Sequence, residues 1–462
     1  MRTTRRGALA LIGGAAALPS ALSRAALAAT DTAPLLVAAP ATAQLAPDGI
    51  PATPVWAYGG RVPGPEIRMR QGDRLVRRFR NDLPQASTIH WHGIRLPNAM
   101  DGVAGLTQDS VPPGGTFDYA FDLPDAGTYW YHPHDRTYEQ VARGLSAPLI
   151  VEEAEAAPDV DADLALVLDD WRLTEDATIA DGFGALHDAA HGGRIGNWIT
   201  VNGSGEWARP VARHDRLRLR LINAANARIF GLELQGLDGW VVALDGMPLD
   251  APLPVGELAL GPAQRADLLV DVTAAAGEDA VLVSLERDGG YAVATFPVAD
   301  GPRARRDPPA ALPPNPVRAL GDVATARAVD LRMEGGAMGR MTSARLGDRT
   351  LDARELAAEG MVWALAGRAG MPDTPLIEAA PGETVAITVT NDTAWPHAMH
   401  LHGHHFRVLT DGAPGPLRDT HLMAPSDTAT FAFVGEAPGD WLFHWHMLEH
   451  AATGMMTWLR VG

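Results

Sequence analysis

Eight of the 16 histidines in this chain fall into four His-x-His pairs. The pairs are His90/His92, His132/His134, His400/His402 and His444/His446. Residues i and i+2 of a β-strand project from the same face, so each pair directs two imidazoles toward one point. Imidazole is the commonest protein ligand for metals, and a ligand set without hard carboxylates suits copper or zinc. Four such pairs predict a cluster of metal ions.

The pairs occur at matched positions of a repeated unit. Gly72 and Gly382 each precede an alternating stretch, and the first histidine of a pair follows 18 residues later in both copies, at His90 and His400. A third copy at 214–234 keeps the spacing but has leucines in place of both histidines. Each copy carries an asparagine nine residues before its pair, at Asn81, Asn223 and Asn391.

The second halves of the units repeat as well. In each copy a proline stands 19 residues before the first residue of the second pair. The proline and that residue are Pro113 and His132, Pro262 and Val281, and Pro425 and His444. The middle copy again has an apolar residue where the others have histidine. Loss of ligands with retention of spacing is typical of a middle domain that binds no metal.

The segments between these repeated positions favour an all-β fold. Short β-type stretches such as 117–121 and 430–434 are separated by Pro/Gly turns, and no helical period is sustained, as in sandwich or barrel domains. A chain of 462 residues is also too long for one hydrophobic core. We expect three β-sandwich domains and one Pro/Arg-rich linker, with domains at 29–155, 156–300 and 318–462 and the linker at 301–317.

Composition excludes several classes of function. The net charge is −18, which disfavours nucleic acid as a partner, and the chain contains no cysteine, so disulfides, thiolate metal sites and cysteine nucleophiles are absent. At the N-terminus, Arg5 and Arg6 lead into an uncharged run, and residues 1–28 resemble a twin-arginine export signal. That run is too short to span a bilayer, and an ordinary secretory signal is the alternative. We expect a periplasmic bacterial protein that is not an integral membrane protein.

Together the motifs resemble those of the multicopper oxidases, in particular the laccase-like, three-domain bacterial type. The matching segments are His90-Trp91-His92-Gly93, His132-Pro133-His134, His397-x-x-His400-x-His402-Gly403 and His444-Trp445-His446-x-x-x-His450-x-x-x-x-Met455. The resemblance implies three cupredoxin-like Greek-key domains, with a trinuclear copper centre between the first and the third. It also implies an oxidoreductase that passes electrons from a reducing substrate, a phenol or a metal ion, to O2.

The resemblance further implies roles for single residues. His90 and His400 would hold the type 2 copper, and Asp101 would supply protons during reduction of O2 to water. The type 3 copper pair would be held by His92, His132, His134, His402, His444 and His446. About three copper ions per chain are therefore expected. The oligomeric state is left open.

One position departs from the family pattern. The family has a cysteine between the last two cluster histidines, which ligates the blue type 1 copper and carries electrons, whereas this chain has Trp445. Indole does not ligate copper. The other members of the type 1 site would be His397, His450 and Met455, so we expect a vestigial site without type 1 copper. Ala451 is a second departure, at a position that is often acidic in bacterial relatives.

Three interpretations of Trp445 stay open at this point. A working trinuclear centre could draw electrons by another route, with the oxidisable indole as a possible relay. The protein could instead be a degenerate relative that binds copper, or serves a structural or partner-binding function, without turnover. The tryptophan could also be a recent substitution or an error in the sequence.

Overall fold

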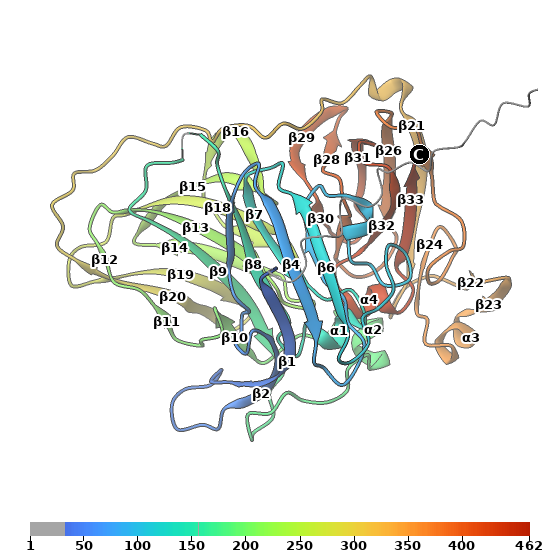
Figure 1. Ribbon diagram of the computed structural model, residues 1–462, viewed down its shortest axis with the longest axis horizontal. Helices are drawn as coiled ribbons and strands as arrows, with labels where there is room; N and C mark the ends of the chain where they lie inside the picture. Colours follow the sequence, from blue (N-terminus) through green and yellow to red (C-terminus); the bar gives the residue numbers. More distant parts are fainter. Residues whose placement is uncertain (1–32, 156) are drawn as a thin grey trace, which may run out of the picture.

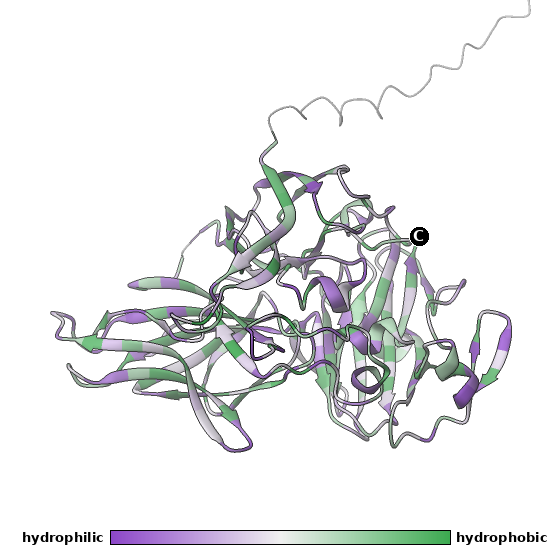
Figure 2. Cartoon of the chain, turned by 90° about the horizontal axis from the view of Figure 1, so that it is seen from below, coloured by the Kyte–Doolittle hydropathy of each residue, from purple (hydrophilic) through white to green (hydrophobic). Residues whose placement is uncertain are grey.

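The computed structural model describes residues 33–155 and 157–462, so the expected export signal lies outside the described residues. The chain folds into three successive pairs of β-sheets, which Figure 1 shows in blue to cyan, green to yellow, and brown to red. The all-β, three-domain prediction is confirmed. Hydrophobic residues recur along the strands, as Figure 2 shows, and they fill a separate core between the two sheets of each pair.

The first domain contains two four-stranded sheets. One has the order β2 (Thr53–Tyr58), β1 (Leu35–Ala43), β4 (Arg74–Asn81) and β6 (Thr116–Asp122). The other has the order β3 (Ile67–Arg70), β8 (Ala147–Glu152), β7 (Gly127–His132) and β5 (His90–His92). The alternation in β4 places Leu75 and Phe79 in the core between the sheets, opposite Trp91 of β5 and Tyr129 of β7.

The second domain contains two six-stranded sheets. The first has the order β10 (Trp198–Val201), β9 (Ala162–Trp171), β13 (Arg216–Asn223), β18 (Arg265–Val272), β15 (Leu237–Leu244) and β16 (Met247–Pro254). The second has the order β11 (Trp207–Ala208), β20 (Gly289–Ala299), β19 (Asp279–Glu286), β14 (Phe230–Gln235) and β17 (Leu258–Leu260), with β12 (Val211–Ala212) also paired to β20. Leu232, which replaces a histidine, is buried in the core of this domain.

The third domain contains a six-stranded and a five-stranded sheet. The first has the order β24 (Trp363–Leu365), β21 (Arg327–Gly335), β26 (Thr384–Asn391), β31 (Thr428–Val434), β28 (Phe406–Thr410) and β29 (Ala413–Arg418). The second has the order β25 (Glu378–Ala379), β33 (Met456–Val461), β32 (Gly439–Trp445), β27 (His397–Leu401) and β30 (Thr420–Met423). A hairpin of β22 (Ser343–Leu346) and β23 (Arg349–Asp352) extends from this domain.

Helices are few and short. They are α1 (Thr137–Gln140), α2 (Leu186–Ala190), α3 (Ala353–Ala358) and α4 (Leu448–Ala452), with single 3-10 turns η1 (Asn98–Met100) and η2 (Val323–Thr325). Helix α4 of the third domain contacts α1 of the first and α2 of the second, and all three meet in the lower centre of Figure 1. Within residues 33–155 and 157–462, no helix is long and apolar enough to cross a membrane.

The segment after β20 crosses the molecule without regular structure, along the top of Figure 1. Arg303 and Arg306 form ion pairs with Asp161. Further along, the Asn315 amide donates to the carbonyl oxygen of Ala126 in the first domain. The segment is therefore held against the first two domains by side-chain contacts. Its boundaries at 301 and 317, like the domain boundaries, stay predictions.

The repeated asparagine has the same function in all three domains. Each one ends the strand before the loop that crosses from one sheet to the other, and each is fully buried. The amide nitrogen of Asn223 lies 2.8 Å from the carbonyl oxygens of both Arg228 and Leu260. Asn81 donates in the same way to the carbonyl oxygens of Gln85 and Val111, and Asn391 donates to those of Trp395 and Ala424. In each case the side-chain oxygen accepts from the backbone N–H two residues later, so the asparagine sets the path of the loop.

We predict that Asn223→Ala lowers the free energy of unfolding by ~2–4 kcal/mol, because it leaves buried carbonyl and N–H groups without partners. Copper content should not change, since the middle domain contributes no histidine to the clusters. Thermal or urea unfolding measures the first effect and metal analysis the second. Asn197→Ala is the matched control, because the hydrogen bonds of Asn197 lie at the surface. Equal losses in the two variants would contradict the buried function of the repeated asparagine.

Candidate metal centre

Strand pairing brings the histidines of each domain together in register. In the first domain His90 of β5 lies opposite His132 of β7, and in the third domain His400 of β27 lies opposite His444 of β32. The second histidine of each pair follows two residues later and projects from the same side. These two sheet ends face each other, so all eight predicted histidines meet at the interface between the first and third domains.

The eight histidines divide into groups whose nitrogen atoms lie within 4.8 Å of one another. The groups are His92/His132/His446, His134/His402/His444 and His90/His92/His400. Each group mixes side chains from the first and the third domain. The first two groups supply three imidazoles each for two sites, and His90 with His400 remains for a third site.

Hydrogen bonds at the outer ring nitrogens orient the imidazoles. His90 Nδ1 donates to the backbone oxygen of Asp101 at 2.8 Å, and His400 Nδ1 donates to that of Asp419 at 2.9 Å. His132 Nδ1 donates to the backbone oxygen of Pro133 at 3.0 Å. Because a carbonyl oxygen only accepts, the hydrogen is on Nδ1, and the lone pair on Nε2 is directed into the centre.

Burial favours the neutral form of several of these imidazoles, which is the form that ligates a metal. Burial, followed by the neighbouring imidazoles, lowers the pKa of His134 to about 3. Burial and neighbouring imidazoles also hold the pKa well below the usual range at His132, His402, His444 and His446. Several unprotonated nitrogens therefore converge in one enclosed space.

The residues fit a metal cluster because their inner nitrogens lack other partners. Inner ring nitrogens that are buried and have no hydrogen bond are His90 Nε2, His92 Nδ1, His134 Nε2 and His400 Nε2. Such groups are costly unless something binds them. Two more pairs of inner nitrogens face each other, at 3.1 Å between His402 and His444 and at 3.3 Å between His132 and His446. These are spacings expected of nitrogens that share one ion at about 2.0 Å.

Asp101 contacts the ligands directly. Its Oδ2 atom accepts a hydrogen bond from His402 Nδ1 at 2.9 Å, and its Oδ1 atom lies 3.2 Å from His90 Nδ1. Oδ1 is buried and has no hydrogen-bond partner. The sequence suggested only that Asp101 supplies protons. The structure adds that this carboxylate, in the first domain, orients His402 of the third domain.

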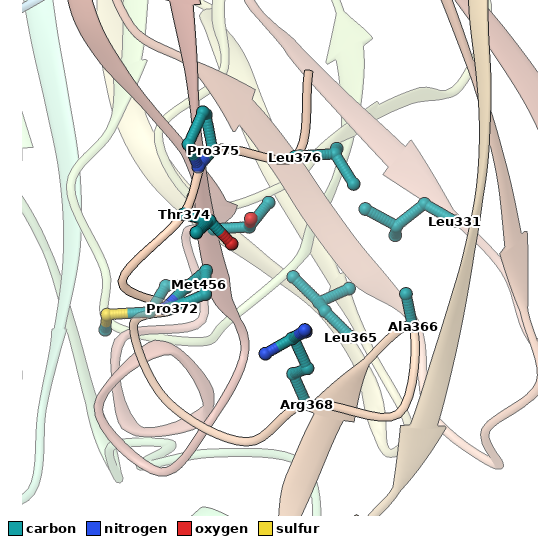
Figure 3. A pocket seen from close by; sticks show the side chains of 10 residues that line it. Leu331, Leu365, Ala366, Arg368, Pro372, Thr374, Pro375, Leu376 and Met456 are labelled. Carbon is teal, nitrogen blue, oxygen red and sulfur yellow. The ribbon is translucent and has the colours of Figure 1, made fainter. Parts of the chain in front are cut away.

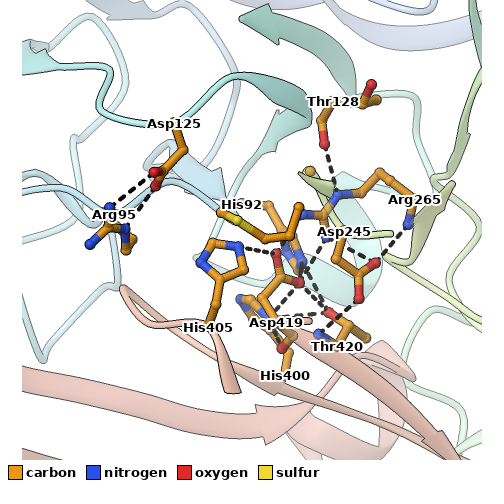
Figure 4. A network of polar contacts seen from close by, with 12 residues as sticks. His92, Arg95, Asp125, Thr128, Asp245, Arg265, His400, His405, Asp419 and Thr420 are labelled. Carbon is orange, nitrogen blue, oxygen red and sulfur yellow. Dashed lines mark hydrogen bonds and ion pairs between the residues drawn. The ribbon is translucent and has the colours of Figure 1, made fainter. Parts of the chain in front are cut away.

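A buried ion pair completes the outer layer of the centre, as Figure 4 shows. Arg265 of the middle domain donates to both carboxylate oxygens of Asp419, at 2.8 and 2.5 Å, and to the backbone oxygen of Thr128 in the first domain. Asp419 in turn accepts from His92 Nε2 at 3.3 Å. Although burial raises the pKa of Asp419, the guanidinium of Arg265 brings it well below its usual range. His405 Nε2 lies 3.6 Å from the same carboxylate.

Arg265 and Asp419 were not identified from the sequence. They lie 154 positions apart, and neither belongs to a His-x-His motif or to a matched position of the repeat. No local signal singled out Arg265, because β18 also contains the charged residues Asp267 and Asp271.

The glycines that end two of the motifs are required by this packing. Gly93 has φ of +86°, and a Cβ atom there would lie 2.3 Å from the Arg265 guanidinium and 2.5 Å from Asp419. Gly403 has φ of +64°, and its Cβ atom would lie 2.2 Å from the Trp441 ring. The glycine of His-x-His-Gly thus leaves room for the ion pair in one domain and for a core tryptophan in the other.

The four residues expected around a type 1 site also come together. Trp445 is fully buried, belongs to the same hydrophobic cluster as Met455, and meets the His397 ring edge-on at 5.4 Å between centroids. His397 Nδ1 and His450 Nδ1 face each other at 3.4 Å. The indole therefore lies beside two imidazoles that are oriented like a ligand pair.

The hydrogen bonds of this pocket determine which nitrogens carry protons. His450 Nε2 donates to the backbone oxygen of His191 at 2.8 Å. The Thr393 hydroxyl donates to the Asn391 side-chain oxygen at 2.7 Å, so His397 Nε2 donates to that hydroxyl at 2.8 Å. Both facing Nδ1 atoms therefore carry lone pairs. Burial lowers the pKa of His450 to about 4, in keeping with a neutral ring.

Helix α4 also carries Glu449, whose carboxylate faces the middle domain. Its carboxylate accepts from the Asn226 amide at 2.9 Å and from the Arg194 backbone N–H at 3.3 Å. Both partners belong to the middle domain. Glu449 therefore fastens α4 to that domain.

Comparisons with known proteins agree with this arrangement. Models described as multicopper oxidase match residues 41–156, 162–296 and 344–462. The chain is 31% identical over 446 residues to multicopper oxidase MmcO of Mycobacterium tuberculosis, covering 88% of this chain and 83% of that protein.

Two solved structures are similar over nearly their whole length. A multicopper oxidase from Pseudomonas thermotolerans is 35% identical with a TM-score of 0.80, covering 93% of this chain and 98% of that chain. Lac15 from a marine microbial metagenome is 43% identical with a TM-score of 0.76, covering 93% and 100%. The chain belongs to the multicopper oxidase family and has its three cupredoxin-like domains. It is an oxidoreductase of that type, and its histidine clusters fit a trinuclear copper centre.

We predict that two variants of Asp101 separate its two functions. Asp101→Leu removes the acceptor for His402 and should lower copper affinity about 10- to 100-fold, as loss of an outer hydrogen bond to a ligand does. Asp101→Asn keeps an acceptor oxygen but no acidic proton, so it should bind copper and be reoxidised by O2 more slowly. Chelator competition and stopped-flow reoxidation measure these effects. Copper affinity in Asp101→Leu equal to that of the parent would remove the orienting function.

Proposed function

We propose that the protein reduces O2 to water at a trinuclear copper centre and that it lacks the type 1 copper of its family. The observation that carries this proposal is the convergence of eight histidines, seven of them buried, whose inner nitrogens have no partners outside the cluster. His90 and His400 would hold the type 2 copper. The type 3 pair would be held by His92, His132 and His446 on one side and by His134, His402 and His444 on the other.

When bound, copper supplies the redox chemistry, and the chain's own residues supply geometry and protons. Asp101 hydrogen-bonds His402 and is the carboxylate available to hold or release a proton beside the centre. Arg265 keeps the carboxylate of Asp419 ionised. That carboxylate orients His92, and the backbone oxygen of Asp419 orients His400. All the cluster histidines except the half-buried His134 are shielded from solvent, which limits the access of bulk water to the reaction.

Trp445 is the reason for proposing that type 1 copper is absent. No cysteine exists in the chain, and the buried indole lies beside His397 where the family has its thiolate. Electrons must then reach the centre by another route. The alternative function, a copper-binding or partner-binding relative without turnover, is favoured by this same substitution. Retention of every cluster histidine favours selection for metal binding over drift, and it does not by itself show turnover.

The wider setting is also proposed. The twin-arginine-like N-terminus supports export to the periplasm, and the strand groups support domains at 29–155, 156–300 and 318–462 joined through 301–317. Phenols and reduced metal ions are the classes of reducing substrate that the family suggests.

We predict about three copper ions per chain, without the intense blue absorption of a copper–thiolate bond. Metal analysis with optical and EPR spectra measures both. The double variant His90→Ala/His400→Ala should lose the type 2 EPR signal and still fold, because the middle domain accommodates leucine at equivalent positions. Four coppers per chain, or a blue protein, would be incompatible with the proposal, and persistence of the EPR signal in the double variant would refute the ligand assignment.

We predict that Trp445→Cys creates a blue copper site, since His397 and His450 already direct lone pairs to one point beside Met455. Replacing a buried indole by a thiol leaves a cavity and should cost ~3–5 kcal/mol of stability, part of which copper binding offsets. Oxidation of phenolic dyes should become much faster than in the parent. Trp445→Ser is the control, because it leaves the same cavity without a thiolate and should stay colourless.

Comparison of the parent with the Trp445→Cys variant also separates the interpretations of Trp445. A parent that already oxidises dyes supports turnover without type 1 copper. An inactive parent that cysteine rescues supports the degenerate or recently substituted interpretation. A Cys variant that loads the trinuclear centre but stays colourless shows that more than one residue of the pocket has changed.

A further inference from the structure

A cavity of about 250 Å³ opens on the histidine centre between the first and third domains. His134 and His444, which belong to the same three-histidine group, form part of its wall. His134 is only half-buried, unlike the other cluster histidines. At the outer side Met371 is 40% exposed, so this cavity connects the surface with the imidazole edges of the cluster.

The wall of this cavity is apolar. Small and aliphatic side chains make up much of it, namely Val103, Ala104, Leu442, Leu448, Ala451 and Ala452. Two thioethers, of Met371 and Met456, and the ring of Tyr138 complete the apolar surface. Among the described residues that line it, none is Asp or Glu, and the Arg136 guanidinium is paired at 2.7 Å with the Glu139 carboxylate. Such a wall, whose side-chain oxygens are the hydroxyls of Thr137 and Tyr138, suits a neutral ligand and offers a hydrated divalent metal ion no carboxylate ligand.

The second departure from the family pattern lies in this wall. Ala451, on α4, occupies a position that is often acidic in bacterial relatives, and here it presents only a methyl group to the cavity. Trp445 removes the thiolate route for electrons, while Ala451 removes a charge beside the exposed edge of the cluster. The two substitutions together close the usual electron route and leave an apolar approach to His134 and His444.

We infer that this cavity binds a neutral aromatic reductant of the hydroquinone class and delivers its electrons directly to the histidine centre. This inference rests on the proposed function. A single aromatic ring fits a space of this size, and thioether sulfurs make favourable contacts with ring edges. The bound ring touches the imidazoles of the centre itself, so no relay through the Trp445 pocket is needed.

The reaction balances with O2, the electron acceptor of the family. Each hydroquinone loses two electrons and two protons and becomes a quinone. Two hydroquinones therefore supply the four electrons and four protons that convert one O2 into two water molecules.

A neighbouring cavity differs from this one because no cluster histidine lines it. It has a volume of about 180 Å³ and lies in the third domain, lined by Leu331, Leu365, Pro372, Pro375 and Leu376 together with Met456, as Figure 3 shows. It shares Met456 with the first cavity but contains none of the cluster histidines. A ring bound there would not contact the centre.

The test uses the full copper-loaded chain and a probe that is not a reductant. ¹⁹F NMR titration of 4-fluorobenzyl alcohol, a neutral ring, measures binding independently of turnover. Ala451→Leu and Ala104→Leu fill the cavity from opposite domains, and each should weaken probe binding at least about ten-fold. Hydroquinone oxidation should fall in proportion, while copper content and reoxidation of the reduced protein by O2 stay unchanged. Ala358→Leu, on the exposed face of α3, is the matched control and should change none of these.

Several results would overturn the inference. One is a parent that does not bind the probe, and another is a pair of filled variants that bind it as well as the parent. Slower reoxidation by O2 with unchanged hydroquinone affinity would identify an O2 passage instead. Met371→Leu should keep both probe binding and hydroquinone oxidation, and loss of oxidation with unchanged binding would show that the bound ring does not deliver its electrons directly to the centre. Probe binding by a protein that takes up no copper would refute the proposed function and leave the aromatic site standing.

Discussion

The ion pair between Arg265 and Asp419 is the interaction on which the histidine centre depends. Both side chains are fully buried, and the pair joins the middle domain to the third while Arg265 also binds the first-domain backbone at Thr128. Removing one partner of a buried pair leaves an uncompensated charge and typically costs ~3–5 kcal/mol. The three domains are therefore held in one arrangement at the place where the histidines of two of them must meet.

This dependence explains why a domain without metal ligands is retained between two domains that have them. The middle domain lost its histidines to leucines, yet it kept the strand and the buried Asn223 that set the sandwich. It also supplies Arg265 behind the ligands and Asn226 beneath α4. Burial raises the pKa of its Asp245, next to the same ion pair, to about 6, which shows how far the junction is removed from water.

The two unusual residues of this chain act on opposite sides of the centre. Trp445 fills the domain-three core beside His397 and His450, which keep the orientation of ligands without a third partner. Ala451 lies six residues later on α4 and faces the cavity that reaches His134 and His444. A substitution in a metal-binding motif thus has to be considered together with the space that neighbouring positions leave open.

The sequence by itself determined the fold class, the three-fold repeat, the eight converging histidines and the missing thiolate. The first three depend on local patterns, either alternation within a strand or a spacing repeated between copies, and the missing thiolate follows from the absence of cysteine. Only the tertiary structure decided that Arg265 meets Asp419, that Asp101 hydrogen-bonds His402, and that a cavity opens beside His134. These contacts join residues from different domains, and pairing across such distances follows from how whole sheets pack rather than from any local pattern in the chain.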